Sequence, residues 1–312
     1  LIKCFPIGLE AKGMKPRTWY QHYDKEVSPS LEYPAATLYE LFEKAVEESP
    51  SRTATLFFGA RISYGKLGRL VDRFAAALAS IGVKQGDRVA LVLPNLPVYP
   101  IAHFAVMKLG GILVPTNPLY VERELEYQLN NSGAETVVAL DALHRRISAV
   151  VPSTSIKRVI YSGVQEFLPC YLNLAYRIKN RHKEKIEPRS DIYFYSRLVK
   201  ERFPEVQAHR AQGDETAIFL YTGGTTGVSK GAILTHQNLV ANVLQTRAWL
   251  REFRDRSETI LAVLPFFHSY GMTTSLHLAI QSQATLVLLP RFELSEAVKR
   301  IKKHRPTIFC GV

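Results

Sequence analysis

Apolar residues along this chain follow two different periods. From Thr37 to Ser49 they recur every three or four positions, which predicts an amphipathic helix. Thr37 and Glu40 stand three residues apart, as in a capping box that begins such a helix. Elsewhere the apolar residues form short unbroken runs, such as DRVALVL from Asp87 to Leu93, and these predict buried strands.

Strands and helices are predicted to alternate through most of the chain. A hairpin is expected first, with TATLFF and RIS as its strands and Gly59-Ala60 as its turn. Further helices are expected at about 66–81, 98–109, 121–130 and 143–150, and further strands at 87–93, 111–115, 136–140 and 158–162. The alternation predicts a layered α/β fold with mostly parallel sheets flanked by helices. In such sheets ligands bind beyond the carboxyl ends of the strands.

The alternation stops between Gln165 and Arg210. Phe167 to Tyr176 are mostly apolar and aromatic, and Arg177 to Lys185 are strongly basic. This composition fits an insert, residues 165–210, that lies on an anionic membrane surface. It also fits an ordinary helix with a solvated basic end, and both interpretations stay open.

Composition narrows the range of partners. Forty basic and 28 acidic residues give a net charge of +12, which favours nucleotides, CoA or anionic lipid, although solubility alone also accounts for it. No aromatic-basic RNA signature appears, so no nucleic-acid partner is expected. Cys4, Cys170 and Cys310 lack the spacing of a zinc site and favour a reducing, cytoplasmic compartment. No apolar run of about 18 residues exists, so no membrane-spanning helix is expected, and peripheral attachment at the inner face of the membrane remains an alternative.

The two ends of the sequence suggest a part of a longer protein. Met14 would be a natural first residue, so residues 1–14 are interpreted as an extension. The last residues, TIFCGV from Thr307 to Val312, have the pattern of a buried strand. Residues 15–312 are therefore expected to form one incomplete N-terminal domain.

The segment YTGGTTGVSKG, from Tyr221 to Gly231, carries the strongest chemical signal. Its glycines allow a ligand to approach the backbone amides, its hydroxyls add donors, and Lys230 adds a positive charge, which together suit a polyphosphate. In the common nucleotide P-loop a Ser or Thr and then a helix follow the lysine. Here Gly231 follows, and the run to His236 has a strand pattern. The loop is therefore expected to join two strands.

This segment, together with two others, resembles the adenylate-forming (AMP-binding) enzymes. LPFFHSYGM, from Leu264 to Met272, is similar to the next motif of that family, and MKLGGILVPTNPLYVEREL, from Met107 to Leu125, is similar to its early structural motif. The similarity covers about Lys15 to Val312 and looks closest to bacterial long-chain fatty-acid–CoA ligases. It implies the N-terminal domain of an acyl-CoA synthetase without its C-terminal lid domain.

The resemblance implies a chemistry in two steps. A fatty-acid carboxylate attacks ATP to give an acyl-adenylate and pyrophosphate, and the thiol of CoA then displaces AMP. Thr222 and Lys230 would act in catalysis, with Thr222 also near a Mg²⁺ ion whose acidic ligand is expected beyond residue 312. The residues implied in holding the phosphates are Thr222, Gly223, Gly224, Thr225, Thr226, Gly227 and Lys230.

The second motif is implied to bind the acyl carboxylate. His268 would orient that carboxylate, while Phe266, Phe267, Tyr270 and Met272 would line the near end of an acyl tunnel. Some long-chain members have a tryptophan gate near position 272, and Met272 departs from that pattern. As residues of an apolar run, these side chains also fit a plain core. His236, at the end of the second strand, is expected to be structural, and His277 is expected on a helix, in the core or at the surface; neither is given a role in the site.

Other functions stay open at this point. The intact protein is expected to use ATP, Mg²⁺ and CoA on a long-chain fatty acid, and this chain alone is expected to be inactive. One alternative is an adenylating ligase for an aromatic or other carboxylic acid. Another is an inactive binding domain. The sequence leaves the oligomeric state open, with a homodimer among the alternatives.

Overall fold

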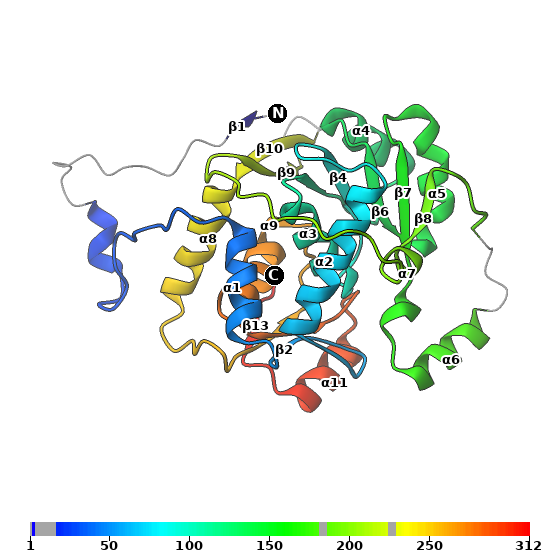
Figure 1. Cartoon of the computed structure of the whole chain (residues 1–312). Helices are drawn as coiled ribbons and strands as arrows, with labels where there is room; N and C mark the ends of the chain where they lie inside the picture. The colour runs from blue at the N-terminus through cyan, green and yellow to red at the C-terminus, as the bar shows by residue number, and fades with distance from the viewer. Residues whose placement is uncertain (1, 4–16, 181–185, 224–228) are drawn as a thin grey trace.

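The chain folds into two β-sheets with helices between them and on their outer faces (Figure 1). The computed structural model describes residues 2–3, 17–180, 186–223 and 229–312. Within these ranges, none of the helices is both long and apolar enough to cross a membrane. The mostly parallel α/β architecture predicted from the sequence is confirmed.

Within the part of the chain that the structure describes, the larger sheet has eight strands in the order β1-β10-β9-β5-β4-β6-β7-β8. Its strands are β1 (Ile2–Lys3), β4 (Arg88–Val92), β5 (Ile112–Pro115), β6 (Thr136–Leu140), β7 (Arg158–Ser162), β8 (Ile192–Phe194), β9 (Thr216–Thr222) and β10 (Lys230–Thr235). All neighbouring strands are parallel except β9 and β10, which form an antiparallel pair.

The smaller sheet has five strands among the described residues, in the order β13-β11-β12-β2-β3. Its strands are β2 (Thr53–Phe57), β3 (Ala60–Ser63), β11 (Thr259–Ala262), β12 (Thr285–Leu288) and β13 (Ile308–Phe309). Only β2 and β3 are antiparallel. Phe57 pairs with Ala60, so the turn consists of Phe58 and Gly59, one residue earlier than predicted. Their φ angles of 47° and 97° are those of a two-residue hairpin turn that follows the twist of the strands.

Helices join most of these strands. The α-helices are α1 (Leu38–Glu48), α2 (Tyr64–Ser80), α3 (Val98–Lys108), α4 (Glu122–Ser132), α5 (His144–Val150), α6 (Cys170–Lys179), α7 (Tyr195–Leu198), α8 (His236–Trp249), α9 (Ser269–Gly271), α10 (Leu278–Gln281) and α11 (Leu294–His304). A π-helix, Met272–His277, connects α9 to α10. Short 3₁₀ helices lie at Thr18–His22, Asp141–Leu143, Val151–Ser153 and Val164–Phe167.

The main core lies between the two sheets. It contains the buried faces of α1, α2 and α3 together with residues of both sheets, such as Leu113 of β5 and Leu286 of β12. A second cluster packs α4 and α5 against the other face of the larger sheet, and a third packs Ala297 of α11 against the smaller sheet. The segment predicted as an insert supplies α6 and the edge strand β8, so part of it belongs to the sheet.

Candidate functional site

The hairpin of β9 and β10 fixes both described ends of the phosphate loop. Thr222 is the last residue of β9, and it pairs in the antiparallel ladder with Lys230, the first residue of β10. Both side chains are exposed. The predicted strand-to-strand connection is confirmed, and it distinguishes this loop from a P-loop that leads into a helix. The predicted residues Gly224, Thr225, Thr226 and Gly227 lie outside the described residues.

A buried asparagine holds the second motif in place from behind. The Nδ2 atom of Asn95 donates to the carbonyl oxygens of Ala262 and Leu264 at 3.1 and 2.9 Å, and the N–H of Phe266 donates to Oδ1 at 2.9 Å. Asn95 is only 2% exposed, so these bonds are shielded from water. The sequence pattern did not indicate this role of Asn95, because its partners lie about 170 residues further along the chain.

The glycine of the second motif allows a close approach of two backbone segments. A Cβ atom at Gly271 would lie 2.4 Å from the carbonyl oxygen of Pro265 and 2.6 Å from that of Leu264. No side chain fits at such distances, so Gly271 lets α9 fold back against the segment before it. This fold brings His268 to the surface at the beginning of α9.

His268 is oriented by the helix that it caps. The backbone N–H of Tyr270 donates to Nδ1 of His268 at 3.4 Å. Because a donor faces Nδ1, a neutral ring carries its proton on Nε2, which is then able to donate to a carboxylate oxygen. The ring is exposed, so a ligand can reach this proton.

One pocket brings the two motifs together. It has a volume of about 180 Å³. Its wall consists of Pro115, Asn117, Tyr120, Gln128, Leu220, Tyr221, Thr222, Gly223, Phe267, His268 and Ser269. The described lining offers hydroxyl, amide, imidazole and aromatic groups and no carboxylate, which suits an anionic ligand. It lies beyond the carboxyl ends of β5 and β9, where α/β sheets bind ligands.

The other predicted substrate residues do not line this pocket. Tyr270 is 40% exposed on α9, and Met272 is 1% exposed within the main core. Phe266 is fully buried and contacts the ring of Tyr99 edge-on, with 5.4 Å between ring centroids. The pocket therefore joins Thr222 and Gly223 to Phe267 and His268, while Met272 contributes to the packing beneath them.

His236 and His277, the two histidines to which the sequence assigns no role in the site, are both buried. His236 is 2% exposed and begins α8, and burial lowers its pKa to about 4. His277 is fully buried, and its Nε2 lies 3.2 Å from Nε2 of His103 on α3. One of these two nitrogens donates to the other, so the pair lies within the core as neutral rings.

The fit to Mg²⁺ rests on a single protein ligand. The described residues contain no group of three His, Cys, Asp or Glu side chains that could hold a metal ion. Thr222 offers one exposed hydroxyl at the end of β9. This suits a Mg²⁺ ion that is bound mainly by phosphate oxygens and needs few protein ligands.

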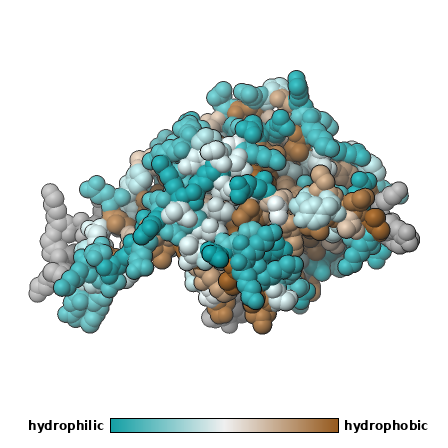
Figure 2. Space-filling model, turned by 90° about the horizontal axis from the view of Figure 1, so that it is seen from below, coloured by the Kyte–Doolittle hydropathy of each residue, from teal (hydrophilic) through white to brown (hydrophobic). Residues whose placement is uncertain are grey.

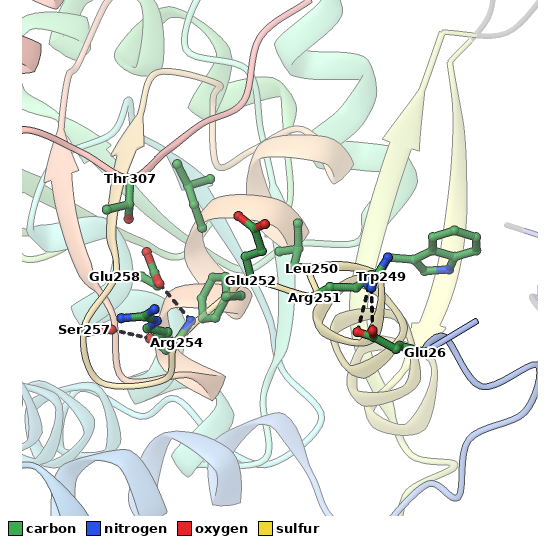
Figure 3. Close-up of a pocket in the computed structure, with 11 residues that line it drawn as sticks. Glu26, Trp249, Leu250, Arg251, Glu252, Arg254, Ser257, Glu258 and Thr307 are labelled. Atoms are coloured by element: carbon green, nitrogen blue, oxygen red, sulfur yellow. Dashed lines mark hydrogen bonds and ion pairs between the residues drawn. The ribbon is translucent and has the colours of Figure 1, made fainter. Parts of the chain in front are cut away.

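A larger pocket lies elsewhere, between the end of α8, the segment that contains Glu26, and β13 (Figure 3). Its volume is about 1250 Å³. On its wall, Arg251 forms an ion pair with Glu26 at 2.7 Å, and the carboxylate of Glu258 accepts a hydrogen bond from the backbone N–H of Arg254 at 2.8 Å. None of the predicted site residues that the structure describes lines it. We assign the site to the smaller pocket, because that is where the predicted chemical groups meet.

Comparison with known proteins identifies the family. A family model described as AMP-binding enzyme matches residues 42–312. The chain belongs to the AMP-binding enzyme family. The matched region of this family member includes both motifs and the pocket that they share.

Two curated relatives of this family member are named long-chain-fatty-acid–CoA ligases. The Bacillus subtilis (strain 168) ligase is 33% identical over 304 residues, which are 96% of this chain and 54% of the relative. The Haemophilus influenzae ligase is 33% identical over 308 residues, which are 95% of this chain and 54% of the relative. The chain thus spans about half the length of the curated relatives that it matches.

Solved structures of this family have the same fold. The long-chain-fatty-acid–CoA ligase FadD1 from Archaeoglobus fulgidus superposes with a TM-score of 0.76 at 25% identity, over 91% of this chain and 53% of that one. The anthranilate CoA ligase AuaEII, solved with anthranoyl-AMP, superposes with a TM-score of 0.74 over 88% of this chain and 50% of that one. At 19% identity the second likeness concerns the fold alone.

Proposed function

We propose that the protein carrying this chain is an ATP-dependent ligase that joins a long-chain fatty acid to CoA through an acyl-adenylate. The observation that carries the proposal is the shared pocket, in which the end of the phosphate loop meets the second motif. A reaction between a carboxylate and a phosphate needs both groups at one place and a site that neutralises their charge.

The predicted site residues at this pocket and at the described ends of the loop take roles that fit their positions. Thr222 and Gly223 receive the phosphates at the end of β9, and Lys230, opposite Thr222 in the ladder, neutralises the departing pyrophosphate. His268 donates from Nε2 to the carboxylate and holds it for attack on the α-phosphorus. Phe267 packs beside the carbon next to the carboxylate. A bound Mg²⁺ ion would add positive charge at the phosphates, with Thr222 as one ligand.

The relatives favour a fatty acid over an aromatic acid. Both curated relatives described above are named as long-chain-fatty-acid–CoA ligases, and each matches at least 95% of this chain. The structural likeness to an anthranilate CoA ligase concerns the fold, which many substrates share. We therefore propose a long-chain acyl substrate, with CoA as the thiol.

Exchange of labelled pyrophosphate into ATP tests this function in the full-length protein. With palmitate, exchange should exceed the rate without acid at least about tenfold, and benzoate or anthranilate should give less than palmitate. Faster exchange with the aromatic acids would assign the protein to the aromatic alternative. ATP binding without exchange for any of these acids would instead support an inactive binding domain.

We further propose that α6 places the protein on an anionic membrane. Tyr171, Leu174 and Ile178 lie at helical spacing on one face and are 70%, 61% and 60% exposed. Arg177 and Lys179 follow on the last turn, and no described carboxylate pairs with them. Figure 1 shows α6 at the periphery of the molecule, and the face seen in Figure 2 is mostly hydrophilic with separate apolar patches. An exposed apolar face with a basic end suits a bilayer surface with anionic headgroups.

Vesicle sedimentation tests the membrane surface. Serine at positions 171, 174 and 178 should reduce binding of the full-length protein to phosphatidylglycerol vesicles. Salt should weaken the binding of the unaltered protein, because exposed charges are screened over about 8 Å at physiological ionic strength. Leu119→Ser is the matched control, since Leu119 is 79% exposed on another surface. Equal binding by the triple variant and the control would reject the proposal.

A further inference from the structure

Helix α4 makes hydrogen bonds to both sides of the phosphate loop. The hydroxyl of Tyr127 donates to the carbonyl oxygen of Ser229 at 3.0 Å, just before β10. The hydroxyl of Tyr221, one residue before the end of β9, donates to Oδ1 of Asn131 at 2.7 Å. Tyr127 and Asn131 are four residues apart, so one face of the helix carries both contacts.

A third hydrogen bond joins the two sides of the loop directly. The hydroxyl of Ser229 donates to the carbonyl oxygen of Thr222 at 2.9 Å. Ser229 therefore receives a hydrogen bond from α4 through its carbonyl and gives one to β9 through its side chain. The described residues on either side of the loop are thus bonded both to the helix and to each other.

The helix itself is fixed to the neighbouring strand. Gln128, which is 2% exposed, donates from Nε2 to the carbonyl oxygen of Pro115 and to the hydroxyl of Thr116, each at 3.0 Å. Leu125 and Leu129 are buried in the cluster against the larger sheet. Because these buried contacts hold α4 against the sheet, its polar face is a rigid reference for the loop.

We infer that Tyr127 and Asn131 are positioning residues for the adenylation reaction. They act through Ser229 and Tyr221 on Thr222 and Lys230, the two residues at which the loop leaves and rejoins the sheet. This inference rests on the proposed function of the loop. A displacement of about 1 Å at a reacting group can change a rate about a hundredfold, so small shifts at these ends matter.

A role in positioning the loop can be distinguished from a role in stabilising the fold. Tyr127 is 38% exposed and Asn131 is exposed, so loss of either polar contact leaves no buried group without a partner. Tyr127→Phe removes one hydroxyl and keeps the ring. We expect this variant of the full-length protein to keep its melting temperature within about 2 °C.

Pyrophosphate–ATP exchange gives the kinetic test. Tyr127→Phe should lower the kcat of exchange about tenfold and leave the KM for the fatty acid unchanged.

Asn131→Leu and Tyr221→Phe break the same hydrogen bond from opposite sides. Each should slow exchange alike, and the double variant should be no slower than either single variant. Tyr193→Phe on β8 is the control, because the described residues give its hydroxyl no hydrogen bond. Unchanged exchange in Tyr127→Phe, or a loss that follows a lower melting temperature, would overturn the inference.

Amide hydrogen exchange tests the same inference without catalysis. In Tyr127→Phe, peptides that contain residues 221–222 and 229–231 should exchange several-fold faster than in the unaltered protein, and peptides of α1 should not change. Equal protection at these residues would refute the positioning role even if the protein had no ligase activity. Conversely, if the unaltered protein showed no pyrophosphate exchange, the proposed function would be contradicted. Amide hydrogen exchange would still test whether Tyr127 holds the ends of the loop.

Discussion

Lys230 is the side chain whose charge the proposed mechanism needs most. It is exposed at the first position of β10, opposite Thr222, and no described carboxylate forms an ion pair with it. Its charge is therefore available to an anionic ligand. The position of this single residue, at the point where the loop rejoins the sheet, links the sequence motif to the chemistry.

Lys230→Ala should slow adenylation without weakening fatty-acid binding. Loss of one charged group that stabilises a departing phosphate typically costs about a hundredfold to a thousandfold in rate. We expect a loss of this size in the kcat of pyrophosphate exchange, with little change in the KM for the fatty acid. Lys66→Ala, at the start of α2, removes another exposed lysine and serves as the control. Turnover that is the same in both variants would contradict the assignment of the loop.

The paired histidines in the core make stability depend on pH. Burial lowers the pKa of His277 to about 3, and burial together with His277 and His236 lowers the pKa of His103 well below its usual range. Below pH 6.5 the unfolded chain therefore takes up protons that the folded chain does not. The stability that the neutral pair provides is complete above pH 6.5 and falls as the pH drops toward the folded-state pKa values.

Urea unfolding at pH 7 and pH 5 measures this dependence. Each buried histidine should remove up to about 1.4 kcal/mol of unfolding free energy per pH unit below 6.5. The double variant His103→Phe, His277→Leu should lose less stability between the two pH values than the unaltered protein. His22→Gln, an exposed substitution, should leave the loss unchanged. An equal loss in the double variant would show that the pair does not titrate on unfolding.

At the scale of elements, the helix α1 shows what local sequence determines. The hydroxyl of Thr37 accepts from the N–H of Glu40 at 3.1 Å, and the N–H of Thr37 donates to the Glu40 carboxylate at 2.7 Å. This is the capping box predicted from the sequence, and Leu38, Phe42 and Ala45 of the predicted stripe are buried. Thr37 is itself 2% exposed, so its contacts are shielded from water.

Thr37→Ala should therefore destabilise the fold. Loss of an N-cap hydroxyl typically costs about 1 kcal/mol, and the burial of Thr37 favours the upper part of the range, about 2 kcal/mol. Chemical denaturation measures the change. Thr37→Ser, which keeps the hydroxyl, should recover most of it. A serine variant as unstable as the alanine variant would assign the effect to packing of the methyl group.

Elements that depend on distant partners were harder to predict from the sequence than elements with a local pattern. Apolar runs bounded by turn residues predicted β6 and β7 with their observed bounds, because each run is buried on both faces of the sheet. The run of β8 is only three residues long, Ile192–Phe194, and it forms a strand by pairing with β7 at the sheet edge. The π-helix Met272–His277 carries no local signal, and its last residue pairs with His103, 174 residues earlier.

The residues of the candidate site also fall into two groups, those predicted from local sequence and those recognised only in the folded chain. The sequence predicted that Thr222, Gly223, Phe267 and His268 share a site, and one pocket contains them all. It did not indicate the supporting residues Asn95, Tyr127 and Gln128. Their roles arise from hydrogen bonds to segments that only the folded chain brings near, whereas the motif residues are recognisable from their own neighbours.

At the scale of the whole molecule, a polar network lies at the opposite end of the smaller sheet from the site. Gln283 precedes β12 and is 7% exposed with a φ of 56°, a strained backbone for this residue. Its side chain bonds to Ser49, to Glu48 at 2.8 Å and to Arg256 at 2.8 Å, and its carbonyl accepts from Arg52 at 2.6 Å. These partners precede β2 and β11, so one residue ties together the segments that enter three parallel strands.

This arrangement predicts that stability and adenylation respond separately to substitution. Gln283→Ala removes three side-chain hydrogen bonds, of which the one to Ser49 is buried and those to Glu48 and Arg256 involve exposed partners. The free energy of unfolding should therefore fall by about 1–3 kcal/mol. The pocket lies beyond the carboxyl ends of the larger sheet and contains none of these residues, so kcat and KM for pyrophosphate exchange at 20 °C should be unchanged. Gln237→Ala, on the exposed side of α8, should change neither quantity. A variant that kept its stability but lost exchange would mean that the network controls the site through the sheet, because β11 runs from this network to the second motif.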